Sequence, residues 1–402
     1  MSSVAVLSMH TSPLAQPGTG DSGGMNVYVR ELGASLAQAG VDVRIYVRRS
    51  DADLPDRVPV EPGLEVVHVD AGPYDLAKEQ LPSVVEAFAD AVAADLAEHP
   101  VDVLHANYWL SAVAGHRLKH QLELPLVATF HTLARVKADA GDAEPEARER
   151  AEVEVIGCCD AICASNPVEA EQLREFYGAA PERIEQVPPG VDHAFFSPGD
   201  QRGARAALGF DDRPTVLFVG RIQPLKGLSV AVRMLAELGD DVRLVVVGGP
   251  SGAEGPAELE RIQRLVQDLG LAERVSFVEP QPHHLLSTYY RAADVVVVPS
   301  RSESFGLVAL ESAACGVPVV AASVGGLRSL VVDGETGFLV ERREPSDFAE
   351  KVDDLLSDPG LAADMGRSAA KLADRYAWST TAGRLRRLYA DLAVRAPVVE
   401  CS

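Results

Sequence analysis

The sequence has few of the features that mark membrane, secreted or zinc-finger proteins. No apolar run approaches the roughly 18 residues that a membrane-spanning helix needs, and the start MSSVAVLSMHTSP has neither a basic region nor a cleavage site. Cys158, Cys159, Cys163, Cys315 and Cys401 form no Cys-x-x-Cys pair and no zinc spacing. We therefore expect a cytoplasmic protein whose cysteines are small buried thiols.

Basic residues are also scarce. The 402 residues include 37 Lys and Arg against 59 Asp and Glu, a formal charge of −22. Such a field repels nucleic acid and anionic membranes, so we expect neither as a partner. A small anionic ligand held by a few local cations stays open. Lysine is the rarer cation, so Lys78 and Lys226, both in glycine-containing stretches, stand out.

Short apolar runs alternate with helical patterns through both halves of the chain. With 47% hydrophobic and 24% charged residues, the chain is globular and long enough for two domains. The alternation predicts α/β domains with parallel sheets. Strands are expected at 4–9, 41–47, 64–69, 101–107, 125–131, 161–165, 215–220, 241–249, 274–278, 293–300 and 317–323, and helices include 26–39, 83–98 and 257–269.

A stretch rich in Pro, Gly and Asp, 186–209, is the best linker candidate. We expect an N-terminal domain over 1–196 and a C-terminal domain over 197–378. The final helical segment, within 379–402, either closes the second sheet or crosses back onto the first domain. Doubly wound sheets bind ligands at the carboxyl ends of their strands, which predicts a site in the cleft between the domains.

Two glycine-containing loops follow expected strands. In PGTGDSGGMN, Gly23 and Gly24 stand at a helix start, where backbone N–H groups can hold a phosphate, although a structural turn is as good an explanation. In VGRIQPLKG, Arg221 and Lys226 could bind one anion or be two solvated cations. Fixed cations can neutralise a leaving diphosphate. We find no Asp-x-Asp-like pair or histidine cluster placed to hold a metal for that task.

The stretch SRSESFGLVALE carries two carboxylates eight residues apart, Glu303 and Glu311. A helix is expected over 305–316, so backbone N–H groups near Phe305 and Gly306 lie at its positive end. A carboxylate can accept two hydroxyl groups at once, which suits sugar ligands. The alternative is a helix cap at Glu303 and a surface charge at Glu311.

Polar residues of the first half follow expected strands or lie on helices without a visible common role. They are Lys78, Tyr108, His131, Thr132 and Arg148. Arg148 alone would be an ordinary charge on a helix surface. Spacing alone does not group them.

Together these motifs point to a known family. GRIQPLKG, PSRSESFGLVALE and VGGLRSLVVDGETGFLV resemble the signature of the retaining glycosyltransferases of family 4. The resemblance implies the GT-B fold, two tandem Rossmann-like doubly wound domains facing across a cleft. The stretches HTSPLAQPGTGDSGGMNVYV, NYWLS and HTLARVK look most like actinobacterial mycothiol-pathway members, which transfer N-acetylglucosamine from UDP-N-acetylglucosamine to 1L-myo-inositol 1-phosphate. Bacterial sucrose-phosphate synthases are a more distant likeness.

The resemblance also implies a role for each motif residue. In the donor site, the diphosphate, sugar and ribose would be held by Gly23, Gly24, Arg221, Lys226, Glu303, Phe305, Gly306 and Glu311. The acceptor site would consist of Asn26, Lys78, Tyr108, His131, Thr132 and Arg148. Within these sets Glu303 would hold the donor sugar and Glu311 the ribose. At the reacting centre the resemblance places His131, Arg221, Lys226 and Glu303, with His131 as an orienting group.

The family's mechanism implies no cofactor and no catalytic metal. Attack on the same face of the sugar lets the leaving phosphate take the acceptor's proton, so no side chain is required as general base. Small-molecule donor and acceptor are the expected partners, and a homodimer is left open.

The chain departs from the family's pattern around the acceptor. It has Asn107 in NYWLSA and Phe130 in TFHTLARVKA, where the mycothiol members are expected to read HYWLSG and TAHTLAAVKN. An alternative is therefore an antibiotic-pathway glycosyltransferase with another UDP- or GDP-sugar and another phosphate- or carboxylate-bearing acceptor. A nucleotide-sugar sensor without activity is disfavoured by the retained cations and glutamates. A GT-B phosphorylase would need inorganic phosphate.

Overall fold

The computed structural model describes residues 3–142, 144–252, 254–395 and 401. These residues form two compact units. The first unit consists of those within Met1–Ala15, Met25–Pro188 and Trp378–Ser402, and the second of those within Gln16–Gly24 and Pro189–Ala377.

The first unit is built on an eight-stranded sheet with the order β3-β4-β2-β1-β5-β6-β7-β8. Its strands are β1 (Ser3–Leu7), β2 (Asp42–Arg48), β3 (Arg57–Glu61), β4 (Leu64–Val69), β5 (Val103–Asn107), β6 (Leu126–Thr129), β7 (Ala161–Ala164) and β8 (Ile184–Gln186). Only β3 pairs antiparallel to its neighbour among these described strands. The chain reverses its direction across the sheet between β1 and β5.

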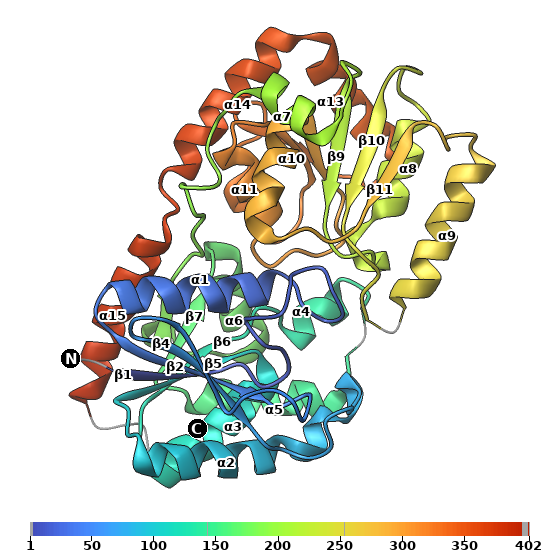
Figure 1. Ribbon diagram of the computed structural model, residues 1–402. Coiled ribbons are helices and arrows are strands. Elements are labelled where there is room, and N and C mark those ends of the chain that lie inside the picture. The colour runs from blue at the N-terminus through green and yellow to red at the C-terminus, as the bar shows by residue number, and fades with distance from the viewer. Residues whose placement is uncertain (1–2, 143, 253, 396–400, 402) are drawn as a thin grey trace. The chain divides into compact units, whose positions relative to one another are not determined.

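Helices cover both faces of this sheet. They are α1 (Gly24–Gln38), α2 (Val85–Glu98), α3 (Trp109–Leu122), α4 (Ala134–Asp139), α5 (Glu146–Cys158), α6 (Pro167–Tyr177) and α15 (Trp378–Ala393), with short 3-10 turns at Lys78–Val84 and Pro181–Arg183. Alternate residues of β1 point to opposite layers, because side chains alternate along a strand. Val4 and Val6 pack in the core with residues of α1 and α15, whereas Ala5 and Leu7 pack with residues of α2 and α3. In the lower part of Figure 1, α1 lies on one side of this sheet and α2 and α3 on the other.

The second unit has a six-stranded parallel sheet with the order β11-β10-β9-β12-β13-β14. Its strands are β9 (Thr215–Val219), β10 (Arg243–Val247), β11 (Val275–Val278), β12 (Val295–Val298), β13 (Val319–Ala322) and β14 (Gly337–Val340). The surrounding helices are α7 (Gln201–Leu208), α8 (Leu228–Leu235), α9 (Gly255–Asp268), α10 (Leu286–Ala292), α11 (Leu307–Ala314), α12 (Leu327–Leu330), α13 (Pro345–Ser357) and α14 (Pro359–Ala373), with 3-10 turns at Pro224–Lys226 and His283–Leu285. Valine-rich strands buried on both faces are typical of such sheets.

The expected strands and helices are present, and three strands were not expected. β3 is a half-buried edge strand that contains Pro59, β8 is only three residues long, and β14 lies inside a stretch of turn residues. None of them has the apolar run that marks a central strand. The expected two-domain α/β architecture is confirmed.

The division between the units differs from the expected boundary at residue 196. The units divide between Pro188 and Pro189, since Val191 and Phe196 belong to the core of the second unit. The loop 16–24 also belongs to the second unit. The last helix, α15, packs in the first unit, where the hydroxyl of Tyr389 lies 2.6 Å from Nδ1 of His105.

The expectation that all five cysteines are separate buried thiols is wrong for two of them. Cys158 and Cys401 are joined in a disulfide, whereas Cys159, Cys163 and Cys315 are free and buried. The two bonded residues are 243 positions apart, so no spacing along the sequence could have paired them.

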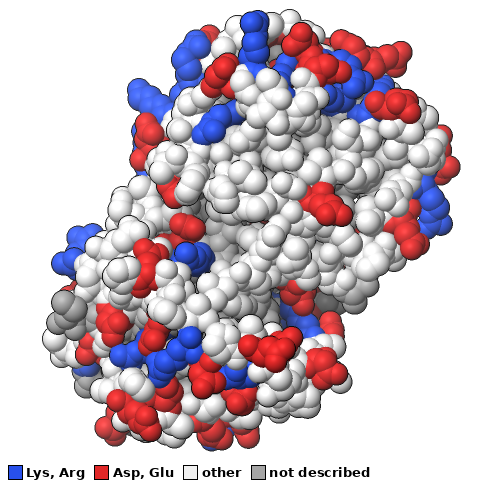
Figure 2. All heavy atoms as spheres, in the orientation of Figure 1, with Lys and Arg blue, Asp and Glu red and all other residues white. Residues whose placement is uncertain are grey.

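Among the described residues, no helix is long and apolar enough to cross a membrane. On the face drawn in Figure 2, Asp and Glu side chains lie interspersed with Lys and Arg side chains over the described parts of both units.

Candidate functional site

The second unit offers a site where its strand order reverses, between β9 and β12. These strands are neighbours, and the chain leaves them toward opposite edges of the sheet. Loops that follow such a pair form the usual ligand crevice of a doubly wound fold. The loop after β9 carries Arg221 and Lys226, and the loop after β12 carries Glu303.

The structure brings these predicted residues together. Nζ of Lys226 lies 2.7 Å from Oε2 of Glu303, and the hydroxyl of Ser300 lies 3.3 Å from the same oxygen. Both charged side chains are about four-fifths covered, with 22% and 18% exposed. Gly23 faces Arg221, since a Cβ on Gly23 would come within 3.1 Å of Nε. These residues are therefore an organised group rather than solvated charges.

Two glycines allow the loops of this group to approach each other. Gly227 has φ +72°, and a Cβ there would lie 2.2 Å from the carbonyl oxygen of Pro299. Gly325 has φ +46°, and its Cβ would lie 2.1 Å from the carbonyl oxygen of Glu303. Gly326 N–H donates to that same oxygen at 2.9 Å. A side chain at Gly227 would push the Lys226 loop away from the end of β12, and one at Gly325 would push the loop after β13 away from Glu303.

Glu311 lies on α11 and is not a surface charge. Its side chain is 7% exposed. Its Oε2 accepts from the hydroxyl of Tyr290 at 2.7 Å, and its Oε1 lies 2.7 Å from Nε2 of His283. Burial and the adjacent carboxylate raise the pKa of Tyr290 well above its usual range. Sequence reasoning missed both partners, because they come from a separate helix and a 3-10 turn.

The start of α11 is close to the expected one. The helix begins at Leu307 rather than 305, with Gly306 at φ +102° as its N-cap residue and Phe305 buried in the core of the unit. A Cβ on Gly306 would lie 2.7 Å from Cδ2 of Leu327. The backbone at this helix start is thus held close to α12. Gly24 also lies near the helix start, since a Cβ added to Gly24 would lie 3.4 Å from Cδ1 of Leu307.

The first unit has its own group of polar residues at the ends of β5 and β6. Tyr108 follows β5 with φ +74° and ψ +155°, a conformation that is essentially confined to glycine. His131, which follows the neighbouring strand β6, has φ +62°. Strained backbone of this kind persists where the surroundings enforce it and is concentrated at functional sites.

Arg148 is the centre of the group and is 2% exposed. Its Nη2 donates to the carbonyl oxygen and the hydroxyl of Thr132 at 2.8 and 3.0 Å, and its Nη1 lies 3.4 Å from the Tyr108 hydroxyl. Glu152 accepts from its Nε at 2.8 Å, and Glu144 lies 3.1 Å from its Nη1. The possibility of an ordinary surface arginine is therefore ruled out.

Two further predicted residues contact this group through Tyr108 and the loop after β1. Nζ of Lys78 lies 5.7 Å from the centre of the Tyr108 ring. The His10 ring lies tilted against the same ring, with the two ring centres 4.4 Å apart. Asn26 is buried and donates to the hydroxyl of Thr11 at 2.6 Å, so it contacts the loop that carries His10.

His131 is held by Asn107. Its Nε2 lies 2.9 Å from Oδ1 of Asn107, which can only accept, so Nε2 carries the proton and Nδ1 is left as the acceptor of the ring. Burial and the nearby His105 lower the pKa of His131 to about 3. The ring is therefore neutral near pH 7. Nδ2 of Asn107 is buried and has no hydrogen-bond partner within the described residues.

Sequence reasoning missed the two carboxylates beside Arg148. Arg148 and Glu152 are four residues apart on α5 and so share one side of that helix, and Glu144, four residues before Arg148, lies just ahead of the helix start. Burial would raise the pKa of Glu144, but Arg148 and Lys137 outweigh it and lower that pKa. Among the described residues, no member of the predicted donor or acceptor sets belongs to a cluster of metal-ligating groups.

Comparisons with known proteins agree with this geometry. Residues 23–190 match the model of the glycosyl transferase 4-like domain, and residues 200–372 match that of the glycosyl transferases group 1. The chain is 46% identical to the D-inositol 3-phosphate glycosyltransferase 2 of Catenulispora acidiphila over 96% of this chain and 94% of that protein. It is 47% identical to the D-inositol 3-phosphate glycosyltransferase of Geodermatophilus obscurus over 96% of this chain and 88% of that protein.

A solved structure agrees as well. The sucrose-phosphate synthase of Thermosynechococcus elongatus superposes with a TM-score of 0.93 and 34% identity, covering 98% of this chain and 99% of its own. The expected GT-B fold is confirmed.

Proposed function

The chain belongs to the family of the D-inositol 3-phosphate glycosyltransferases, and from this premise we propose a specific reaction. The protein would transfer N-acetylglucosamine from UDP-N-acetylglucosamine to 1L-myo-inositol 1-phosphate, with retention of configuration at the anomeric carbon. One observation carries this proposal beyond glycosyl transfer. Lys78, Thr132 and Arg148 gather around Tyr108 in the first unit, where a phosphate-bearing acceptor finds cations and hydroxyl groups together.

The second unit would hold the donor. Arg221 and Lys226 would face the diphosphate, and Glu303 would hold hydroxyl groups of the sugar. The Lys226–Glu303 ion pair supports these roles, because it fixes a cation beside a sugar-binding carboxylate before any ligand arrives. A preorganised cation of this kind stabilises the negative charge that develops on the leaving group, typically by a factor of about 100 to 1000 in rate.

The first unit would hold the acceptor phosphate by exchange of anions. Glu152 is fully buried and also accepts from the Ala134 N–H and the Tyr177 hydroxyl, so it stays in place. Glu144 is only partly buried and is held by Lys137 and Arg148. A phosphate arriving at Arg148 would take the place of Glu144 and leave the guanidinium paired throughout.

The reaction then needs no protein base. The bond between the anomeric carbon and the diphosphate oxygen breaks, and the bond to the inositol oxygen forms on the same face. The inositol hydroxyl proton passes to the leaving phosphate. His131 supports this assignment, because a histidine with a pKa of about 3 is a poor base near pH 7 but orients a hydroxyl group well through Nδ1. Closing off water limits hydrolysis of the donor.

A second candidate keeps the chemistry and changes the acceptor. Asn107 departs from the pattern of the mycothiol members, and it bonds directly to His131. A difference so close to the reacting group favours a related acceptor that also bears a phosphate or a carboxylate, used with another UDP- or GDP-sugar.

The test is release of nucleoside diphosphate from UDP-N-acetylglucosamine, UDP-glucose and GDP-mannose, each with and without 1L-myo-inositol 1-phosphate. The proposal predicts release from UDP-N-acetylglucosamine that depends on the inositol phosphate. Donor binding without that dependence would favour the second candidate. A further arm with inorganic phosphate alone would reveal a phosphorylase.

A further inference from the structure

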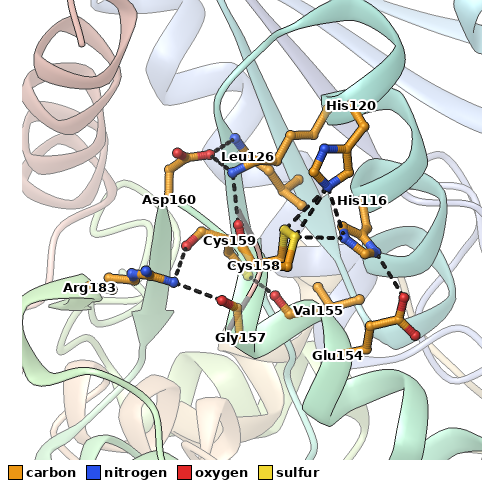
Figure 3. Close-up of a disulfide and its surroundings, with 12 residues drawn as sticks. His116, His120, Leu126, Glu154, Val155, Gly157, Cys158, Cys159, Asp160 and Arg183 are labelled. Carbon is orange, nitrogen blue, oxygen red and sulfur yellow. Dashed lines mark hydrogen bonds and ion pairs between the residues drawn. A yellow bond between two sulfur atoms is a disulfide. The ribbon is translucent and has the colours of Figure 1, made fainter. Parts of the chain in front are cut away.

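Four side chains with metal-binding atoms meet in the first unit, away from the residues described above. His116 and His120 lie one turn apart on α3, Cys158 ends α5, and Cys401 comes from the C-terminal segment. Their ligand atoms all lie within 4.8 Å of one another, and no other such group occurs in the part of the chain that the structure describes. Figure 3 shows both imidazole rings pointing at the sulfur atoms of the disulfide.

The distances match the edges of a metal-centred tetrahedron. With Zn–S near 2.3 Å and Zn–N near 2.0 Å, the four ligand atoms of a tetrahedral zinc lie about 3.3–3.8 Å apart. Nε2 of His120 lies 3.2 Å from Nε2 of His116 and 3.3 Å from each sulfur, and Nε2 of His116 lies 3.6 Å from Sγ of Cys401. Nε2 of His116 and Sγ of Cys158 lie within 4.8 Å of each other, and the two sulfurs, which are bonded to each other, must separate to complete the tetrahedron.

We propose that the reduced form of this cluster is a Cys₂His₂ zinc site that ties the C-terminal segment to α3 and α5. A dithiol reductant supplies two electrons and two protons to the Cys158–Cys401 bond and is itself oxidised to a disulfide. Zinc then binds the two thiols and the two neutral imidazoles. Two protons leave the thiols as the Zn–S bonds form.

Residues around the cluster stand where they can orient its ligands. Nδ1 of His116 lies 3.7 Å from Oε1 of Glu154, longer than a hydrogen bond, so the ring has a carboxylate on one side and the cluster on the other. Nζ of Lys119 is buried and donates to the carbonyl oxygen of Cys158 at 2.8 Å and to Asp160 at 2.6 Å. Three of the four ligands therefore stand on fixed elements.

The site is separate from the proposed reaction. Tyr108 precedes α3 and His120 lies near its other end, about 18 Å away at 1.5 Å per residue. Loss of the metal should therefore leave glycosyl transfer at its basal rate. The benefit expected of the site is attachment of the C-terminal segment.

The experiment is zinc binding to the full chain after reduction and removal of the reductant. We expect about one equivalent of Zn²⁺ per chain, competed by a chelator, and tetrahedral ligand-field bands when Co²⁺ is used in its place. Cys401→Ser and His120→Gln should each weaken binding by 100-fold or more. Glu154→Gln should weaken it by roughly 10-fold, as loss of a residue that orients a ligand does. Cys401 is exposed, so its replacement does not disturb the core.

Cys315→Ser is the matched control, because it removes one buried free thiol from the second unit and should leave zinc binding unchanged. Binding of less than a tenth of an equivalent by the reduced protein would overturn the proposal and leave a plain disulfide. Equal affinity in Cys401→Ser would overturn it too, since the C-terminal segment would then play no part.

Discussion

The two units present their candidate binding residues in different ways. In the second unit, the positive-φ positions at the loops are glycines, such as Gly227 and Gly325, which let backbone segments approach closely. In the first unit, Tyr108 and His131 hold positive φ with full side chains. A backbone that accepts strain in order to aim a side chain indicates that the side chain itself contacts the ligand. On the proposed function, the first unit would therefore recognise its ligand mainly through side chains, and the second mainly through backbone groups and paired charges.

The two units also differ in how many carboxylates surround their candidate binding cation. Lys226 has one carboxylate partner, Glu303, whereas Arg148 lies between Glu144 and Glu152. On the proposed function, Lys226, with a single carboxylate beside it, would face the charge that appears on the leaving diphosphate. Arg148, with two carboxylates beside it, would exchange Glu144 for the phosphate of the acceptor. This contrast predicts effects on turnover in one unit and on acceptor affinity in the other.

The largest expected effect is on turnover. Lys226→Ala removes the fixed cation beside Glu303, and kcat should fall by about 100- to 1000-fold with the KM for the acceptor within about twofold. Steady-state rates with varied acceptor measure both. Lys351→Ala serves as the control, because Lys351 is a half-buried lysine of the same unit that forms ion pairs with Glu350 and Asp354 on α13, away from Glu303. A near-normal kcat would remove Lys226 from the reaction.

Acceptor affinity should show the next largest effect. Lys78→Ala removes one cation from the group around Tyr108, and the KM for the phosphate-bearing acceptor should rise by about 10- to 100-fold, the value of a charge-assisted hydrogen bond. Binding of UDP, measured by calorimetry, should not change. Arg150→Ala is the control, because Arg150 lies on α5 beside Arg148 but is 77% exposed. If UDP binding weakens together with acceptor binding, the assignment of the donor to the second unit and of the acceptor to the first is wrong.

Donor affinity should change by less. Glu311→Gln keeps the shape of the side chain but removes the charge that its contacts with Tyr290 and His283 rely on. The Kd for UDP should rise by about 10-fold, while the KM for the acceptor stays the same. Retention of full UDP affinity would show that Glu311 serves only the packing of the second unit.

The smallest effect concerns stability in acid, and it belongs to the first unit. Burial lowers the pKa of His105 and of His131 to about 3. The unfolded chain takes up these protons near pH 6.5, so stability is complete above that pH and falls as the pH drops toward 3. Each histidine contributes a slope of about 1.4 kcal/mol per pH unit in this window.

His105→Gln should therefore reduce the acid dependence of the free energy of unfolding by about that slope, measured by urea denaturation between pH 4 and 6.5. His105 is fully buried and bonds to Thr129 and Tyr389, so the variant will also be less stable at every pH. The slope, rather than the absolute stability, decides the outcome. An unchanged slope would mean that His105 is charged in the folded protein.

The sequence predicted the elements that follow simple rules. Central strands such as β4 and β12 were recognised by their apolar runs, and the cations and glutamates after β9 and β12 by their places at strand ends. Edge strand β3 was missed because Pro59 and half-buried positions interrupt its pattern.

Contacts between distant segments could not be predicted. The pairing of Glu311 with His283 depends on how α11 packs against the 3-10 turn at His283–Leu285, and that of Cys158 with Cys401 depends on tertiary structure that joins residues 243 positions apart. The carboxylates beside Arg148 were visible as a spacing of four, but their burial was not, because burial depends on tertiary packing. The roles of the acceptor residues came from resemblance alone, since their separation along the chain carries no signal.

The most direct test of the account compares an acceptor with and without its phosphate. We would measure kcat/KM for 1L-myo-inositol 1-phosphate and for myo-inositol, with UDP-N-acetylglucosamine as donor, in the wild type and in Lys78→Ala. The account predicts a preference for the phosphate on the order of 1000-fold in the wild type, because an acceptor without it forgoes charge-assisted hydrogen bonds to both Lys78 and Arg148. That preference should fall at least 10-fold in the variant. The same preference in both proteins would contradict the account, because the cations of the first unit would then not bind the acceptor's phosphate.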